Sequence, residues 1–223
     1  GAVIHAPVEA TTFESGKLGV TVATKSGRKI KARYVVLATG YELAAIAPSK
    51  GQKVISTWAL ATRPQPSQLW PREAFIWEAS DPYLYLRATP DGRVICGGED
   101  EEFQDEEKRD ALLPTKINTI SRKLAKLMPQ LDVTPEYTWA GSFGVTPTGL
   151  PIIGAVPGHP RIQSIMGYGG NGITFSRIAA ELVTSAILGK KDADAALFAS
   201  KGVKYRQGDS ASAEWMPPLS RPG

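Results

Sequence analysis

A run of glycines interrupted by one asparagine, Gly169-Gly170-Asn171-Gly172, lies between a predicted strand and a predicted amphipathic helix. The start of a helix exposes backbone N–H groups that have no acceptor within the helix, and the helix dipole makes this end positive. Such an end attracts negative charge, and glycines let a planar ligand approach the main chain because no Cβ stands in the way. The pattern indicates a binding site for an electron-rich ligand, although a simple tight turn explains the same glycines equally well.

A second group of chemically capable side chains lies on one predicted strand. Side chains alternate along a strand, so Tyr83, Tyr85 and Arg87 share one face. Leu84 and Leu86 share the other face, which is apolar. Two phenols and a guanidinium on one surface are suited to binding a small polar molecule, whereas the alternative is an ordinary strand face with the guanidinium in solvent.

Other site chemistries lack the residues that they need. His5 and His159 are far apart and Cys96 is single, so we expect no metal site. Neither a Gly-x-Ser-x-Gly elbow nor a Gly-x-x-x-x-Gly-Lys-Ser/Thr loop occurs, which argues against a hydrolase and a nucleoside triphosphatase. The net charge of +4 comes from scattered side chains rather than a basic cluster, so nucleic-acid binding is not expected. A single cysteine and no apolar stretch of roughly 20 residues predict a cytoplasmic protein without a membrane span.

The first part of the chain has the alternation typical of strands. Apolar residues alternate over 17–23 and again over 30–34, with a Ser-Gly turn between them, which predicts a β-hairpin with one buried face. The continuous apolar run 35–38 predicts a strand buried on both faces that ends at Thr39-Gly40. Short strand patterns separated by prolines over 53–98 then predict an antiparallel sheet.

Two helices are predicted in the second part. The acidic run 99–107 leads into the first, in which Pro114 suits the opening turn and apolar residues recur at helical spacing until Pro129. Strands are expected at 137–145 and 162–166, and the second helix at 173–188, closed by Gly189. A loose tail is expected over 201–223 because it is rich in Ser, Pro and Gly. The whole pattern predicts an α+β fold.

Four segments, in this order, resemble those of D-amino-acid oxidase-like flavoenzymes, a family that includes glycine oxidase and sarcosine oxidase. They are RYVVLATG, YLYLRATPDGRVICGG, TPTGLPIIGAVP and IQSIMGYGGNGITFSRIAAELV. The resemblance implies a mostly antiparallel substrate domain with flanking helices and part of a Rossmann-like FAD-binding domain, namely its β-meander and one buried strand. On this basis residues 1–48 are assigned to the FAD domain, 49–140 to the substrate domain, 141–200 to the return to the FAD domain, and 201–223 to the tail.

The resemblance also implies which residues bind FAD. The Gly-rich turn and helix start, Gly169, Gly170, Asn171, Gly172, Ile173 and Thr174, are expected to face the pyrimidine edge of the flavin. Negative charge on that edge is stabilised by the N–H groups and the helix dipole. Thr39 and Gly40 are expected near the adenosine or pyrophosphate part, and Val8 is expected to present its backbone to adenine.

For the substrate, the resemblance points to Tyr83, Tyr85 and Tyr168 as walls or hydrogen-bond donors. Where glycine-oxidase-like members carry an arginine for the substrate carboxylate, this chain has Phe143 nearby, which cannot form that ion pair. Arg87 or an arginine outside this chain is expected to replace it, or the substrate is an amine without a carboxylate there. We assign no catalytic residue, because hydride transfer to flavin needs orientation more than a general base. Cys96 is expected to be a buried thiol rather than a flavin attachment point.

The implied activity is oxidation of a C–N bond of an amino acid or amine to an imine, with FAD taking the hydride. The strand, Gly-x-Gly-x-x-Gly turn and helix that open the family's FAD domain have no counterpart in the first part of this sequence, which starts at Gly1 without Met. We therefore expect a piece of a longer enzyme that needs its amino-terminal portion to hold most of the dinucleotide. A dehydrogenase with an acceptor other than oxygen, or an inert fragment or subunit paired with a separate nucleotide-binding portion, remain the alternatives.

Overall fold

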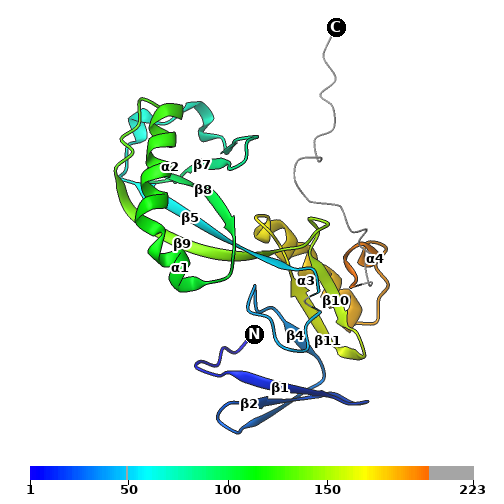
Figure 1. Ribbon diagram of the computed structural model, residues 1–223. Helices are drawn as coiled ribbons and strands as arrows, with labels where there is room; N and C mark the ends of the chain where they lie inside the picture. The colour runs from blue at the N-terminus through cyan, green and yellow to red at the C-terminus, as the bar shows by residue number, and fades with distance from the viewer. Residues whose placement is uncertain (49, 201–223) are drawn as a thin grey trace. The chain divides into compact units, whose positions relative to one another are not determined.

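The computed structural model describes residues 1–48 and 50–200, so the tail predicted for 201–223 lies outside the described residues. The fold is α+β with mostly antiparallel sheets, which confirms the predicted class (Figure 1). The chain forms two compact units. One combines Gly1–Gln52 with the chain from Thr146 onward, and the other is Lys53–Val145.

The first unit begins with an antiparallel sheet in the order β1-β2-β3, formed by β1 (Ala10–Ser15), β2 (Val20–Thr24) and β3 (Lys29–Ala32). Val20 and Val22 are buried, and a turn at Gly27 joins β2 to β3, as the hairpin pattern predicts. Ile30 remains 48% exposed, so the apolar alternation of β3 is not matched by burial. β1 was not predicted, because its side chains are mostly polar and exposed and give no apolar alternation.

The second sheet of this unit has the order β10-β11-β4 and comprises β4 (Val35–Leu37), β10 (Ile152–Val156) and β11 (His159–Met166). β4 runs parallel to β11, whereas β10 and β11 are antiparallel. Leu37 is buried but Val36 is 42% exposed, so the prediction that β4 is buried on both faces is wrong. Side chains alternate along a strand, so Leu37 and Val36 lie on opposite faces, and within the described chain the face that carries Val36 is only partly covered.

Helix α3 (Gly172–Ile187) and the short α4 (Ala195–Phe198) pack against this second sheet. Their shared core contains Ile153, Ala179, Leu182, Val183 and Phe198. The observed α3 agrees with the helix predicted for 173–188, since its apolar residues recur on one face.

The second unit is built on a five-stranded antiparallel sheet in the order β6-β7-β8-β5-β9. Its strands are β5 (Lys53–Thr62), β6 (Ile76–Trp77), β7 (Leu84–Ala88), β8 (Val94–Glu102) and β9 (Pro135–Val145). Two short 3-10 turns, Pro66–Gln68 and Pro71–Glu73, lie between β5 and β6. The acidic run 99–107 was predicted to lead into the first helix, but its first four residues, Glu99–Glu102, are the end of β8.

Two helices follow β8, namely α1 (Glu106–Ala111) and α2 (Leu113–Leu127), with Pro114 in the first turn of α2 as predicted. Ile117, Ile120 and Leu124 of α2 pack against one face of the sheet, where the fully buried Trp58, Leu60, Leu84, Leu86, Val94 and Cys96 lie. This is the main core of the unit. Among the described residues, no helix is both long and apolar enough to cross a bilayer.

Candidate functional site

The glycine-rich turn before α3 leaves the start of the helix uncapped. Asn171 is the N-cap residue, but its side chain makes no capping hydrogen bond, and the first intrahelical bond runs from the Phe175 N–H to the Asn171 carbonyl at 3.1 Å. The N–H groups of Gly172, Ile173 and Thr174 therefore have no acceptor within the helix. Ile173 is 91% exposed. This helix start fits an electron-rich group, since three donors and the positive end of the dipole coincide there.

Two glycines between β11 and α3, Gly167 and Gly170, differ in the space that surrounds them. Gly167 has φ +75°, and a Cβ there would lie 2.6 Å from Cγ2 of Thr146, so a larger residue is excluded. Gly170 is different, because a Cβ at that position would meet no atom within 4 Å. The space beside Gly170 is thus open to a ligand.

The structure brings the Thr39-Gly40 turn to the same sheet edge as this helix start. β4 and β11 are parallel neighbours, with Leu37 opposite Ser164, so both strands end at one edge. Thr39-Gly40 follows β4 by one residue, and the glycine-rich turn follows β11 directly. In open sheets with parallel strands, ligands bind outside the carboxyl ends of the strands. Val8 is not part of this edge, because it lies in the segment that leads into β1 of the other sheet, where it is 52% exposed.

The predicted substrate residues fall into both units. Tyr168 lies in the turn before α3, where it is partly buried and its ring stacks on Phe175 with centroids 6.4 Å apart. Burial raises the pKa of Tyr168 above its ordinary value. Tyr83, Tyr85 and Arg87 belong to the five-stranded sheet of the second unit.

Tyr85 and Arg87 lie on the side of β7 that faces away from α2, as the alternation predicts. Leu84 and Leu86 are fully buried towards α2, while Tyr85 is partly buried and Arg87 is exposed. We call the side of the sheet opposite α2 the tyrosine face. Its part over β6 to β8 carries Trp77, Tyr83, Tyr85 and Arg87.

Four rings on and beside this face form an aromatic cluster: Phe75, Trp77, Tyr83 and Tyr85. Phe75 stacks on Tyr85 with centroids 6.4 Å apart, and Trp77 meets Tyr83 edge-on at 5.6 Å. Phe75 and Trp77 are about two-thirds exposed, at 64% and 66%. Neither ring was predicted as a site residue, because β6 has only two residues and shows no periodicity.

A carboxylate completes the cluster. The Tyr83 hydroxyl donates to Oδ2 of Asp100 at 2.7 Å. The pKa of Tyr83 is raised well above its usual range. Burial of the phenol is the largest cause, followed by the hydrogen bond to Asp100 and the negative charge of that carboxylate. Burial and the same carboxylate also raise the pKa of Tyr85. Both phenols are therefore neutral hydrogen-bond donors at physiological pH.

The described residues contain no group of three or more His, Cys, Asp or Glu side chains that could hold a metal ion. Cys96 is fully buried in the core beneath the sheet, and burial raises the pKa of its thiol to about 12. A buried, protonated thiol is suited to packing rather than to covalent attachment of a ligand.

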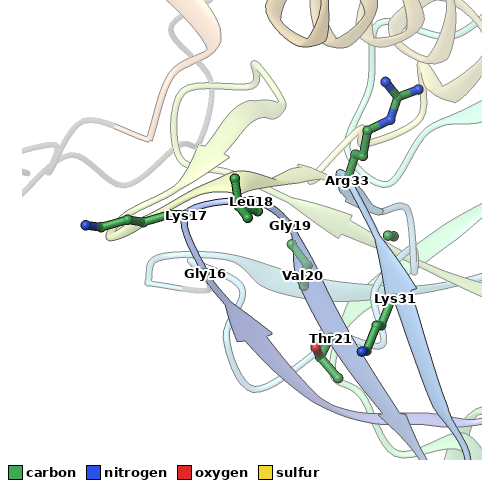
Figure 2. A pocket seen from close by; sticks show the side chains of 9 residues that line it. Gly16, Lys17, Leu18, Gly19, Val20, Thr21, Lys31 and Arg33 are labelled. Carbon is green, nitrogen blue, oxygen red and sulfur yellow. The ribbon is translucent and has the colours of Figure 1, made fainter.

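A cavity of about 700 Å³ lies over the first sheet, lined by Gly16–Thr21 and Lys31–Arg33. Figure 2 shows that Lys17, Lys31 and Arg33 around it point in different directions. None of the predicted site residues lines this cavity. Without converging polar groups it does not have the composition of a specific ligand site.

Comparison with known proteins connects this arrangement to a family. The model of the DAO family, described as FAD dependent oxidoreductase, matches residues 1–186. The chain is 25% identical over 199 residues to the probable oxidoreductase OrdL of Rhizobium meliloti (strain 1021), covering 85% of this chain and 44% of that protein. It is 28% identical over 180 residues to gamma-glutamylputrescine oxidoreductase of Escherichia coli (strain K12), covering 75% and 39%.

The crystal structure of glycine oxidase from Geobacillus kaustophilus superimposes with a TM-score of 0.66 at 18% identity, covering 86% of this chain and 51% of that one. At this identity the likeness shows the fold alone. The chain spans about half the length of that structure and less than half of the two curated relatives. The resemblance stated from the four sequence segments is confirmed, and the chain belongs to the FAD dependent oxidoreductase (DAO) family.

Proposed function

We propose that this chain contributes the substrate face and part of the FAD site of an enzyme that oxidises a C–N bond of an amino acid or amine to an imine. FAD supplies the hydride acceptor when bound. The observation that carries the proposal is the shared sheet edge, where the Thr39-Gly40 turn and the uncapped start of α3 both follow parallel strands. Family membership supports the cofactor.

In this proposal the main chain does most of the cofactor binding. The N–H groups of Gly172, Ile173 and Thr174 bind the electron-rich edge of the flavin, and the dipole of α3 stabilises negative charge there by about 0.3–1 kcal/mol. Gly169 and Gly170 allow close approach because they carry no Cβ, and Asn171 is the N-cap residue at the same binding edge. The Thr39-Gly40 turn contacts the pyrophosphate or adenosine part, and Val8 contacts adenine.

The tyrosine face positions the substrate. Tyr83 supplies an apolar ring while its hydroxyl donates to Asp100, and Tyr85 supplies a ring with a neutral hydroxyl donor. Tyr168 adds a third phenol from the turn before α3. The exposed guanidinium of Arg87 is the candidate partner for a substrate carboxylate, in place of Phe143. No side chain is assigned as a general base, because orientation of a neutral amine suffices for hydride transfer.

The first test is the visible absorption spectrum of the purified chain with and without added FAD. Bound flavin bands between about 370 and 450 nm, wavelengths set by the cofactor itself, would mean that the start of α3 and the Thr39-Gly40 turn suffice to hold FAD without the amino-terminal portion. Gly170→Leu fills the open space beside the helix start, and we expect it to weaken FAD binding at least about tenfold, or ~1.4 kcal/mol. Gly16→Leu is the matched control in the same unit, since a Cβ there has no contact closer than 3.6 Å.

If Gly170→Leu and the native chain bind FAD equally, the helix start does not hold the cofactor. If neither binds, FAD retention requires residues outside this chain, and the inert-fragment or separate-subunit alternative gains support. Supplying the relatives' nucleotide-binding portion, as a separate chain or a fusion, then tests whether flavin absorbance and oxidation return together.

Activity is measured on the flavin-loaded protein with a panel of amino acids and amines. Release of hydrogen peroxide identifies oxygen as the acceptor, whereas reduction of an artificial quinone without peroxide identifies a dehydrogenase. Absence of both activities across the panel would contradict the proposed reaction. The cytoplasmic location predicted from the sequence is kept as part of the proposal, and cell fractionation tests it.

A further inference from the structure

Asp100 differs from its neighbours in the acidic run Glu99–Glu102 of β8. Each of the three glutamates forms an ion pair with a lysine: Glu99 with Lys123, Glu101 with Lys116 at 2.7 Å, and Glu102 with Lys53 at 2.8 Å. Within the described part of the chain, the hydrogen-bond partner of Asp100 is Tyr83 and no lysine or arginine pairs with it. One carboxylate of the run is thus left without a cation.

A β-bulge gives Asp100 its direction. Trp58 of β5 pairs with Gly98 and Ser56 pairs with Glu101, so the ladder between β5 and β8 is irregular at this point. Glu99, inside the bulge, has φ +57°, and its side chain points towards α2, where its lysine partner lies. Asp100 points the other way, to Tyr83 on the tyrosine face. Bulges commonly re-aim a side chain next to a functional site.

Only one oxygen of this carboxylate is satisfied. Oδ2 accepts the Tyr83 hydroxyl, whereas Oδ1 is buried and has no hydrogen-bond partner among the described residues. A buried carboxylate oxygen without a donor carries a desolvation cost that a bound donor removes. The partner that would satisfy Oδ1 is therefore a hydrogen-bond donor, and a positively charged donor would form the strongest hydrogen bond with it.

The rings around Asp100 favour the same kind of ligand. The edge-on pair of Trp77 and Tyr83 and the neighbouring Tyr85, 6.5 Å from Tyr83, offer π faces that attract an organic cation. Trp77 is 66% exposed, so its ring is accessible to a ligand, while Tyr83 and Tyr85 are partly buried. A carboxylate beside aromatic rings repels anions and binds ammonium groups.

We propose that Asp100, with Tyr83 and Trp77, binds an alkylammonium group of the substrate that is not the nitrogen being oxidised. A carboxylate stabilises the protonated form of a bound amine, whereas forming the C=N bond of an imine requires a free lone pair on the reacting nitrogen. The nitrogen bound by Asp100 therefore stays protonated and is not the one oxidised. A substrate that binds in this way has two basic nitrogens, as diamines and diamino acids do, and this inference rests on the proposed amine oxidation.

Binding is tested first without the cofactor, on the chain labelled with ¹⁵N at its tryptophan side chains. The probe is n-butylammonium chloride, with sodium n-butanoate and sodium chloride as controls, and the Trp77 indole signal is assigned by Trp77→Phe. We expect a saturable shift of this signal with butylammonium alone. Asp100→Asn keeps an acceptor for Tyr83 and removes the charge, and we expect it to weaken binding at least about tenfold.

Glu102→Gln is the matched control, because it removes one charge from the same strand at a side chain that is 55% exposed. It should change the affinity less than about twofold. Equal affinities of the native chain and Asp100→Asn, or a shift produced equally by sodium chloride, would overturn the proposed ammonium site. So would the absence of any saturable shift in the native chain.

The flavin-loaded protein tests the substrate class. Asp100→Asn should lower kcat/KM for 1,4-diaminobutane at least about tenfold while changing kcat/KM for n-butylamine less than about twofold, because kcat/KM is unaffected by butylammonium held unproductively at Asp100. Loss of both oxidations to the same extent would contradict the role in selecting a second nitrogen. If neither amine is oxidised by the native protein, the oxidation proposal fails, while the indole titration still decides whether the ammonium site exists.

Discussion

Gly97→Ala is the substitution whose effect the geometry of the tyrosine face determines most directly. Gly97 pairs with Tyr85 across β8 and β7, and the Tyr85 ring lies over it. A Cβ at Gly97 would stand 2.3 Å from the Tyr85 hydroxyl oxygen and 2.4 Å from Cζ. Since ordinary contact begins at 3.4 Å, the ring must move by about 1 Å.

The expected cost follows from what that movement disrupts. Overpacking costs about 1–3 kcal/mol, and loss of the near-parallel stacking between Tyr85 and Phe75 adds about 0.5–1.5 kcal/mol. Replacing glycine by alanine also lowers the conformational entropy of the unfolded chain, which stabilises the folded state by about 0.4–1 kcal/mol and offsets part of this cost. We expect a net loss of about 2 kcal/mol in the free energy of unfolding, together with weaker butylammonium binding at the displaced cluster.

Urea unfolding in a double-mutant cycle measures the effect. In a Tyr85→Ala background the clash is absent, so Gly97→Ala should there be within about 0.5 kcal/mol of neutral, giving a coupling of about 2 kcal/mol. Gly141→Ala, in β9 of the same sheet, is the control because a Cβ there meets no atom within 4 Å. A Gly97→Ala cost that is the same with and without the Tyr85 ring would refute the reasoning.

Three further predictions concern the second unit. Because burial raises the pKa of the Cys96 thiol to about 12, only about one thiol in a thousand is ionised even at pH 9. Alkylation by iodoacetamide should therefore be slow at both pH 7 and pH 9 and become fast in urea, and fast alkylation of the folded chain at pH 9 would contradict this burial. Lys123→Met leaves the buried Glu99 carboxylate without its cation and should cost about 2 kcal/mol by urea unfolding, whereas Lys53→Met at an exposed pair should cost less than about 1 kcal/mol; equal costs would contradict the difference in burial. Leu124→Ala empties a fully buried position of α2 and should cost about 2–5 kcal/mol by the same assay, and a cost below 1 kcal/mol would mean that α2 is not packed as described.

Local periodicity was enough to predict most of the regular structure. The helix at 173–188 and the alternation of Tyr83, Leu84, Tyr85 and Leu86 correspond closely to α3 and β7, because amphipathic patterns depend on residues close in sequence. Elements without a continuous apolar pattern were missed, including β1, the two-residue β6 and α4. The prediction that Val36 is buried was wrong for a related reason, since an apolar run does not reveal whether another layer packs on each face of its strand.

The sequence by itself determined the family, the glycine-rich helix start and the tyrosine-bearing strand, because each depends on contiguous residues. Only the tertiary structure decided which distant segments meet. Parallel pairing of β4 with β11 places Thr39-Gly40 at the edge that carries the start of α3, although more than a hundred residues separate the two strands. The bulge in β8 and the lysines on α2 and β5 likewise distinguish Asp100 from three adjacent glutamates that look equivalent in sequence. Long-range pairing and partner geometry are properties of the folded chain, and no local pattern encodes them.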